Sequence, residues 1–342
     1  MRRFAACALE ATLLTAFAGL MAPLPTAAQE KVRFGTNWRA QGAHGGWYQA
    51  LADGTFKRLG LDVEIVPGGP QVNNRPLLAA GRLDFLMAGN LLHSFDNVKN
   101  GIPTVVVGAF FQRDPQILMA HRGVYKDFAD LKTAKTILVG KDGQFSYWQW
   151  LKVEHGFRDE QLRPYTFNLA PWLADKRMVQ QGYAVAEPIA AVAQGAEPAV
   201  FLLADHGWST YSTTVETRND MVRTKPELVR KFVEGSILGW VSFLYGDRRA
   251  AVALIRKENP EISAETIEAE VAKLIELGIV DSGDALTKGI GALDPVRVRD
   301  FYAKMVKAGL YKPGEVDTAK VATDRFVNKG IGLDVKKKLG NR

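Results

Sequence analysis

Short apolar runs alternate with helical patterns through the first two thirds of the chain, and this alternation constrains the fold more than any other feature of the sequence. The almost continuously apolar run Thr104–Phe111 predicts a strand that is buried on both faces. Leu61–Val66 alternates apolar and polar residues, which predicts a half-buried strand. Strands that alternate with helices form βαβ units and a parallel sheet, so the sequence predicts an α/β fold.

The expected elements fall into two α/β series, one after the other, followed by helices. Strands are expected at 32–35, 61–66, 85–88 and 104–111 in the first series, and at 117–120, 135–139, 165–169, 183–186, 200–203 and 211–216 in the second. Helices are expected at 45–58, 76–80, 91–100, 147–154 and 172–180, and then over most of the chain after residue 216. The stretch 113–115 and the run near Thr213 are the expected crossings between two lobes, whose facing sheets would form a cleft.

The first 28 residues have the pattern of an export leader. Arg2 and Arg3 precede a mostly apolar run over 4–21, and small residues then lead to Ala28. This pattern predicts a secretory signal peptide over 1–28, cleaved near Ala28, and a periplasmic mature protein. The alternative, a membrane anchor, is disfavoured because the run is short and interrupted by proline. The only cysteine, Cys7, lies in this leader, so we expect no disulfide, no thiolate metal site and no cysteine nucleophile in the mature chain.

Charge and motif patterns argue against several classes of function. The net charge is +7, but the basic residues are scattered and the densest run, 336–338, lies at the C-terminus. Nucleic-acid binding would need a basic stripe with interleaved aromatic residues. The sequence shows no such stripe, so we expect no binding of nucleic acid. The sequence has no Gly-x-Ser-x-Gly motif, no Walker loop and no histidine spacing typical of metal ligands. We therefore expect no enzyme activity, no metal and no cofactor.

Candidate ligand-binding residues in the first series follow the expected strands, because ligands of open α/β sheets bind at the carboxyl ends of strands. Trp38 and His44 lie in a polar, glycine-rich loop that opens the first helix, where backbone N–H groups suit a polar or anionic group. Both could instead be packing residues. Gly68, Gly69 and Asn73 follow the next strand, where glycine lets backbone approach a ligand, although an ordinary turn with an Asn cap is the alternative. A further candidate in this series is Asn90.

The second series supplies aromatic and acidic candidates. Tyr183 and Glu187 come at a strand end just before a helix, where the carboxylate could accept hydrogen bonds from a ligand amine or could simply occupy the first helical turn. Tyr147 and Trp148 belong to an aromatic-rich segment, 144–150, with more rings than one helix face needs for a core. Stacking on a planar ligand and burial in the core remain alternatives for each. Tyr211, at the start of the last strand, is also a candidate.

Several of these segments resemble a known family. Asn37-Trp38 with His44-Gly45-Gly46, Gly68-Gly69-Pro70 with Asn73-Asn74, and Gly182-Tyr183 with Glu187-Pro188 are similar to motifs of bacterial ABC-importer solute-binding proteins. The nearest group is the nitrate/sulfonate/taurine cluster and, within it, the thiamine-pyrimidine-synthase-like domain. Tail stretches at 232–240, 259–260 and 280–284 resemble it as well, so the likeness covers nearly the whole mature chain.

The resemblance implies a two-lobed periplasmic-binding-protein fold, type II-like with two crossovers and a helical C-terminal extension. We expect one lobe to comprise 29–111 and 217–342 and the other 112–216. Such proteins capture a small planar or anionic nutrient between the lobes and deliver it to an inner-membrane ABC permease with its ATPase. A monomer is expected. In pyrimidine-binding relatives aromatic residues sandwich the ring and an acid holds its amino group, roles that transfer to Trp38, Tyr183 and Glu187.

Two alternatives stay open at this stage. The first is an exported binding protein that feeds a membrane sensor instead of a permease. The second is the fungal enzyme of the same domain, which makes the thiamine pyrimidine from its own histidine and bound pyridoxal phosphate and carries a cysteine-rich iron-binding motif. His93 matches that histidine, but Gly89 stands at the lysine position and 207–212 replaces the cysteine cluster. These departures disfavour the enzyme.

Overall fold

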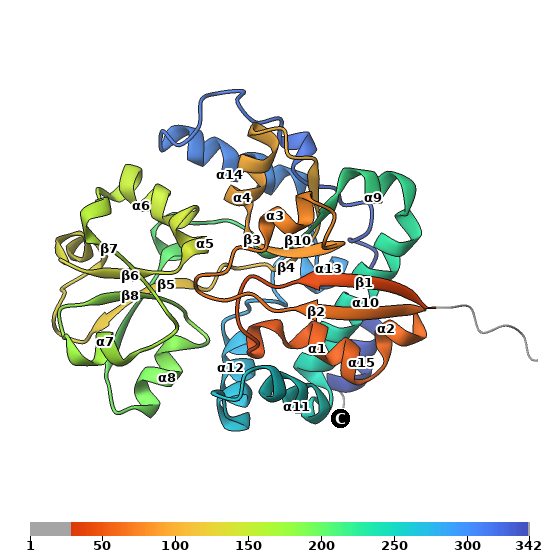
Figure 1. The fold of residues 1–342 in the computed structure, drawn as a ribbon, viewed down its shortest axis with the longest axis horizontal. Coiled ribbons are helices and arrows are strands. Elements are labelled where there is room, and N and C mark those ends of the chain that lie inside the picture. Colours follow the sequence, from red (N-terminus) through yellow and green to blue (C-terminus); the bar gives the residue numbers. More distant parts are fainter. Residues whose placement is uncertain (1–28, 341–342) are drawn as a thin grey trace, which may run out of the picture.

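The computed structural model describes residues 29–340, which form two five-stranded sheets lying side by side (Figure 1). The expected leader, 1–28, lies outside the described residues. The first sheet has the strand order β2-β1-β3-β10-β4 and the second β7-β6-β8-β5-β9. The strands are β1 (Glu30–Gly35), β2 (Leu61–Val66), β3 (Phe85–Asn90), β4 (Thr104–Phe111), β5 (Gln116–His121), β6 (Ile137–Val139), β7 (Leu162–Pro164), β8 (Val179–Tyr183), β9 (Pro198–Leu202) and β10 (Ser212–Arg218).

Each sheet is mixed and not purely parallel, which corrects the expectation of parallel sheets. β1 pairs in parallel with β2 and β3, whereas β10 runs antiparallel to β3 and β4. In the second sheet β5 is the strand that runs antiparallel to its neighbours β8 and β9. β5 and β10 are the first strands after the two crossings. Each therefore enters its sheet from the side of the other lobe and runs in the direction opposite to its neighbouring strands. β10 belongs to the first sheet, although 212–216 was expected in the second lobe.

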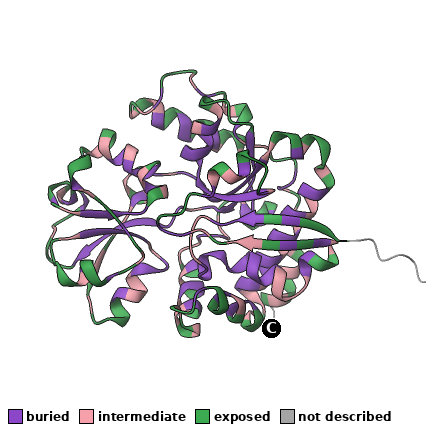
Figure 2. Ribbon diagram, in the orientation of Figure 1, coloured by how far each residue is buried: buried purple, intermediate pink, exposed green. Residues whose placement is uncertain are grey.

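The helices pack around both sheets and bury their central strands, whereas the edge strands β7 and β9 stay partly exposed (Figures 1 and 2). They are α1 (Gly45–Ala52), α2 (Thr55–Arg58), α3 (Arg75–Ala79), α4 (Leu91–Lys99), α5 (Lys141–Gln144), α6 (Tyr147–His155), α7 (Ala170–Ala174), α8 (Glu187–Ala193), α9 (Asn219–Thr224), α10 (Pro226–Tyr245), α11 (Arg249–Glu258), α12 (Ala264–Glu276), α13 (Ala285–Lys288), α14 (Pro295–Lys307) and α15 (Leu333–Gly340). Among residues 29–340, no helix combines the length and the apolar character needed to cross a bilayer.

Three local predictions were wrong in the second lobe, and one helix is divided. The strand expected over 183–186 lies earlier in the chain, because β8 spans Val179–Tyr183 and a turn follows it. The segment 165–169, expected as a strand, is irregular, because β7 already ends at Pro164 and Phe167 has a positive φ of 60°. The helix expected over 172–180 ends at Ala174, and β8 starts at Val179. In the first lobe the helix expected over 45–58 divides into α1 and α2 at Gly54, whose φ is 75°.

Close packing of α1 against α10 holds the core of the first lobe. The indole rings of Trp47 and Trp240 meet edge to face at 5.5 Å, and the Trp47 Nε1–H donates to Ser236 Oγ at 3.1 Å. Gly239 on α10 faces the backbone of α1, where an added Cβ would collide with the carbonyl oxygen of Gly46. A residue without a side chain is therefore required for this helix–helix distance.

Two chain segments connect the lobes, one between β4 and β5 and the other between η4 (Leu203–His206) and β10. Asp114 in the first segment accepts a hydrogen bond from Trp208 Nε1–H in the second, at 2.8 Å. Arg297 on α14 donates to the backbone oxygens of Gln112 and Thr210, one in each segment. The two crossings are thus tied to each other and to a helix of the first lobe, next to the space between the sheets.

Candidate functional site

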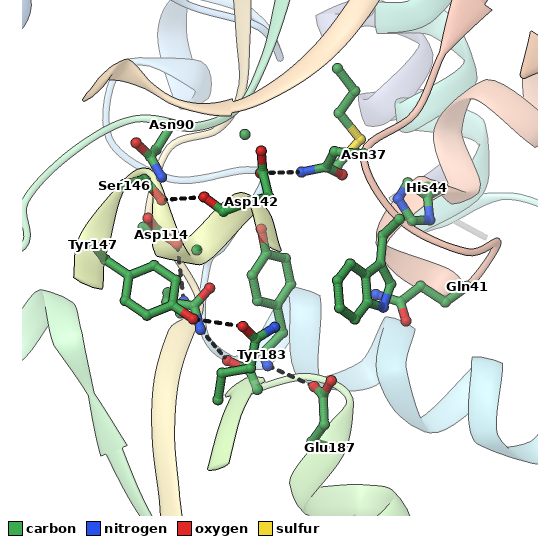
Figure 3. A pocket seen from close by; sticks show the side chains of 17 residues that line it. Asn37, Gln41, His44, Asn90, Asp114, Asp142, Ser146, Tyr147, Tyr183 and Glu187 are labelled. Atoms are coloured by element: carbon green, nitrogen blue, oxygen red, sulfur yellow. Dashed lines mark hydrogen bonds between the residues drawn. The ribbon is translucent and has the colours of Figure 1, made fainter. Parts of the chain in front are cut away.

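A cavity of about 50 Å³ lies between the two lobes, and Figure 3 shows its lining side chains. They come from the ends of strands and the starts of helices in both lobes, and from the first crossing. The lining residues are Asn37, Trp38, Gln41, His44, Met87, Gly89, Asn90, Asp114, Gln116, Asp142, Gly143, Ser146, Tyr147, Gln181, Gly182, Tyr183 and Glu187. We call this space the central cavity.

Trp38, which follows β1, reaches across the gap between the lobes. Its ring stacks on Tyr165 with centroids 6.0 Å apart and an interplanar angle of 22°, and it meets the Phe167 ring edge to face with centroids 5.8 Å apart. Gly68 packs against the backbone that carries Trp38, because an added Cβ would come within 2.5 Å of Thr36 O and of the Asn37 carbonyl carbon. The Trp38 ring therefore forms one wall of the central cavity while it contacts aromatic residues of the opposite lobe.

His44 presents an uncharged imidazole to the central cavity. The side chain is 1% exposed, and neither ring nitrogen has a hydrogen-bond partner among the described residues. Burial lowers the pKa of His44 to about 3, so the ring is neutral at physiological pH. A neutral imidazole offers one N–H donor and one nitrogen acceptor, and both are free here for a ligand.

Glu187, the first residue of α8, is a buried carboxylate on the second-lobe side. Its Oε2 accepts from the Tyr183 backbone N–H at 2.7 Å, and its Oε1 lies 3.4 Å from the donating Tyr165 hydroxyl. Burial raises the pKa of Glu187 to about 7 despite these hydrogen bonds. The side chain therefore holds the strand-to-helix turn in place, which is the structural role that the sequence left open for a carboxylate in the first turn of a helix. It also lines the cavity.

Gln181 in β8 organises the neighbouring wall. Its Oε1 accepts from the Gly140 backbone N–H at 2.6 Å and from the Tyr147 hydroxyl at 2.7 Å. This pair of hydrogen bonds fixes the start of α5 and the ring of Tyr147 relative to the strand. The wall is thus held in place by the protein before any ligand arrives.

Asp142 on α5 faces the first lobe. Its Oδ1 lies 3.3 Å from His93 Nε2, and its Oδ2 accepts from Asn37 Nδ2 at 3.4 Å. Burial acts to raise the pKa of Asp142, but His93, Arg75 and Asn37 outweigh it, and the pKa lies below its usual value. This carboxylate is therefore ionised and bridges the lobes at the rim of the cavity.

The electrostatic character of the central cavity is acidic. Asp114, Asp142 and Glu187 line it, and no Lys or Arg is among its lining residues. Burial raises the pKa of Asp114 to about 6, so at neutral pH it carries a charge that is poorly solvated. Such a lining accepts hydrogen bonds from a ligand and opposes the entry of an anion.

The structure brings six of the predicted site residues together at the central cavity: Trp38, His44, Asn90, Tyr147, Tyr183 and Glu187. The other five predicted residues lie elsewhere: Gly68, Gly69, Asn73, Trp148 and Tyr211.

Each of the five has a structural contact that accounts for its position. Gly68 supports the Trp38 loop, and Gly69 accepts the backbone hydrogen bond of a turn from Val72 N–H at 3.0 Å. Asn73 Oδ1 accepts from Arg75 N–H, as a helix cap does. Trp148 is buried in the second lobe and donates to Asp159. The Tyr211 ring is buried beneath the Arg297 guanidinium, 3.9 Å from it.

Sequence reasoning missed several lining residues. Asn37 and Gln41 belong to the loop that was singled out, and Asp114 to the expected crossing, so their positions carried a signal. Asp142 follows the short strand β6 and could have been found by the same strand-end rule. Gln181 lies within β8, and no sequence pattern distinguishes it from a core position.

Comparison with known proteins agrees with this architecture. The model of the NMT1/THI5-like family matches residues 41–245. A curated relative, 4-amino-5-hydroxymethyl-2-methylpyrimidine phosphate synthase THI11 of Saccharomyces cerevisiae, is 23% identical over 221 residues, which are 60% of this chain and 64% of that protein. The matched stretches span between 34% and 64% of the length of the curated relatives.

Solved structures show the same fold. The alkanesulfonate-binding protein SsuA from Xanthomonas axonopodis pv. citri, bound to MOPS, has a TM-score of 0.60 at 15% identity and covers 87% of this chain and 99% of its own. The periplasmic nitrate-binding protein NrtA from Synechocystis PCC 6803 has a TM-score of 0.58 at 13% identity and covers 87% of both chains. The predicted two-lobed periplasmic-binding-protein fold is therefore confirmed.

Proposed function

The chain belongs to the NMT1/THI5-like family, and from that premise we propose that it is the exported solute-binding component of an ABC importer. The observation that carries the proposal is the central cavity, whose wall comes from both lobes: Trp38 and His44 on one side, Tyr183 and Glu187 on the other. A ligand that bridges the lobes stabilises the closed state through contacts that the open state lacks. The ligand would be released to an inner-membrane permease.

The lining supports a small planar nitrogen heterocycle with amino groups as the ligand. Carboxylates that accept hydrogen bonds, together with a neutral His44, suit a ring that carries N–H donors and a ring-nitrogen acceptor. The sulfonate or other acid that the sequence left possible is disfavoured, because Asp114, Asp142 and Glu187 would repel it. A curated relative is named as the synthase of the phosphate of such a pyrimidine, 4-amino-5-hydroxymethyl-2-methylpyrimidine phosphate.

A pyrimidine-forming enzyme is the second candidate, favoured by the match to the yeast synthase and by His93. The residues do not fit the pyridoxal phosphate and iron of that enzyme. Gly89, at the lysine position, has a φ of 87°, a conformation that a lysine adopts only under strain, and 207–212 contains no cysteine. His93 is buried and directed at Asp142, and we derive no reaction step from it.

Mass spectrometry of the ligand released from protein purified out of its native host tests the proposal. We expect one small nitrogen heterocycle, which raises the melting temperature when it is added back and is recovered unchanged after incubation. A micromolar ligand at hundredfold excess over Kd should add about 2.7 kcal/mol to the unfolding free energy. Recovery of a chemically altered compound would overturn the binding-protein assignment in favour of the enzyme. A gene for a membrane kinase beside this one, in place of permease and ATPase genes, would favour the sensor alternative.

A further inference from the structure

The structure contains a second, larger cavity that adjoins the central one. It has a volume of about 350 Å³ and lies between α8 of the second lobe and α12 of the helical tail. Its lining includes Gln41 and Glu187, which also line the central cavity, and adds Tyr165, Phe167 and Glu270. We call this space the side chamber. The central cavity alone is well below the volume of about 300 Å³ at which ligand sites of proteins begin, whereas the side chamber reaches it.

Glu270, on α12, is the least expected residue of the side chamber. Its side chain comes from the helical tail and is 2% exposed. The carboxylate accepts one hydrogen bond, from the Gly42 N–H to Oε2 at 2.5 Å, and Oε1 has no hydrogen-bond partner within residues 29–340. A buried carboxylate with one free oxygen is costly unless a donor or a cation reaches it.

Gln41 provides an independent indication of a ligand. It is 5% exposed and lies between the central cavity and the side chamber, lining both. Within the part of the chain that the structure describes, its side-chain amide makes no hydrogen bond, and Figure 3 shows the side chain at the wall of the central cavity. Buried side-chain amides in folded proteins are nearly always hydrogen-bonded. The free amide therefore points to a polar group that binds between the two cavities.

The titratable groups around the side chamber are acidic. Glu187, Glu261 and Glu270 line it, and no Lys or Arg does. Arg39 donates to Glu261 at 2.8 Å, and its guanidinium lies 5.1 Å from the Phe167 ring centroid. Among residues 29–340, the two buried carboxyl groups, Glu187 and Glu270, thus form no ion pair with a Lys or Arg side chain.

We propose that the side chamber is a second subsite, which binds a positively charged amine substituent of the ligand between Glu187 and Glu270 while the ring occupies the central cavity. The inference rests on the proposed function and specifies its ligand as elongated and basic. Gln41 would contact the ligand where it passes from one cavity to the other. The aromatic wall of Tyr165 and Phe167 suits the apolar part of the substituent and the ammonium group itself.

A matched pair of probes tests the subsite: 4-amino-5-hydroxymethyl-2-methylpyrimidine and its 5-aminomethyl counterpart, which differ in a neutral hydroxyl and an ammonium group. Calorimetry should show the amine binding about tenfold or more tightly than the alcohol, the size expected for a hydrogen bond to a charged group. In Glu270→Gln this preference should fall to about twofold or less, with affinity for the alcohol nearly unchanged. Glu276→Gln, which removes an exposed carboxylate of the same helix outside the side chamber, is the control and should keep the preference.

Proton release gives a second readout. At pH 6.5 the amine should displace about one proton from the buried carboxylates, measured as a dependence of the binding enthalpy on the ionisation enthalpy of the buffer. The alcohol should displace none. Equal affinity for both probes, or a preference that survives Glu270→Gln, overturns the subsite and leaves the proposed function standing. Binding of neither probe, together with recovery of an unrelated compound from the native protein, overturns the pyrimidine ligand and the subsite with it.

Discussion

Replacing Glu270 by glutamine should remove much of the dependence of the unfolding free energy on pH in the ligand-free protein. Glutamine keeps the shape of the side chain and the acceptor for the Gly42 N–H, so the variant loses the titrating group and little else. Burial, with a smaller contribution from the neighbouring Glu187, raises the pKa of Glu270 to about 8 despite the hydrogen bond from Gly42. In the unfolded chain a glutamate titrates near 4.5.

The sign follows from the protons bound in the two states. Between pH 4.5 and 8 the folded protein holds a proton on Glu270 that the unfolded chain has lost, so stability falls as the pH rises. One proton corresponds to about 1.4 kcal/mol per pH unit, which amounts to roughly 3 to 4 kcal/mol between pH 5 and pH 8. His44 acts in the opposite direction, because its pKa of about 3 makes the folded state lose stability as the pH falls below 6.5. The difference between wild type and variant cancels the contribution of His44.

Urea unfolding at half-unit steps from pH 5 to pH 8.5 measures this difference. As the pH rises, we expect the unfolding free energy of the variant to increase relative to that of the wild type. The total change in the difference should be roughly 3 kcal/mol. Glu261→Gln serves as the control, because its carboxylate is exposed and its removal should shift the curve without changing its slope. Parallel curves for Glu270→Gln and the wild type would refute the reasoning, since they would mean that Glu270 titrates alike in both states.

Other predictions follow from the site, the core and the leader. Glu187→Ala and Trp38→Ala should each weaken binding of the native ligand about five- to a hundredfold, a loss of roughly 1–3 kcal/mol in calorimetry, whereas His93→Ala should matter much less. A loss of binding confined to His93→Ala would contradict this assignment. Gly239→Val should lower the unfolding free energy by about 1–3 kcal/mol or more, because the side chain meets the α1 backbone, and an unchanged urea midpoint would disprove that packing argument. Amino-terminal sequencing of the exported protein should begin near Gln29, and an intact leader would contradict export.

The fold was largely predictable from local patterns, because strand periodicity and length are local properties. Thr104–Phe111 and Leu61–Val66 appear with the predicted bounds and burial. The direction of β10 was not predictable, since it depends on the chain arriving from the other lobe. The errors over 165–180 arise where β7, α7 and β8 are each five residues or shorter, too short for a period to identify them.

Site residues were predictable where their position at the end of a strand brings them to the cavity. They were not predictable where only side-chain packing decides which residue lines it. Tyr183 and Glu187 lie at a strand end, and the strand-end rule places them at the cavity. Tyr147 and Trp148 are adjacent on one helix, yet one contacts Gln181 at the cavity and the other turns to Asp159. Both rings are buried, so the polarity of the helix does not show which of them meets the cavity, and the sequence could not separate them.

In the function that we propose, Trp38 connects ligand binding to closure of the lobes. One face of its ring stacks on Tyr165 of the opposite lobe, and the same ring lines the central cavity. A ligand that stacks on Trp38 therefore meets the remaining face or edge, while the covered face already stabilises the closed arrangement. Because Tyr165 also donates toward Glu187, the aromatic contact and the acidic contact share one residue. Loss of either side chain should thus affect both closure and ligand affinity, which explains why we expect Trp38 and Glu187, from different lobes, to contribute comparable energies.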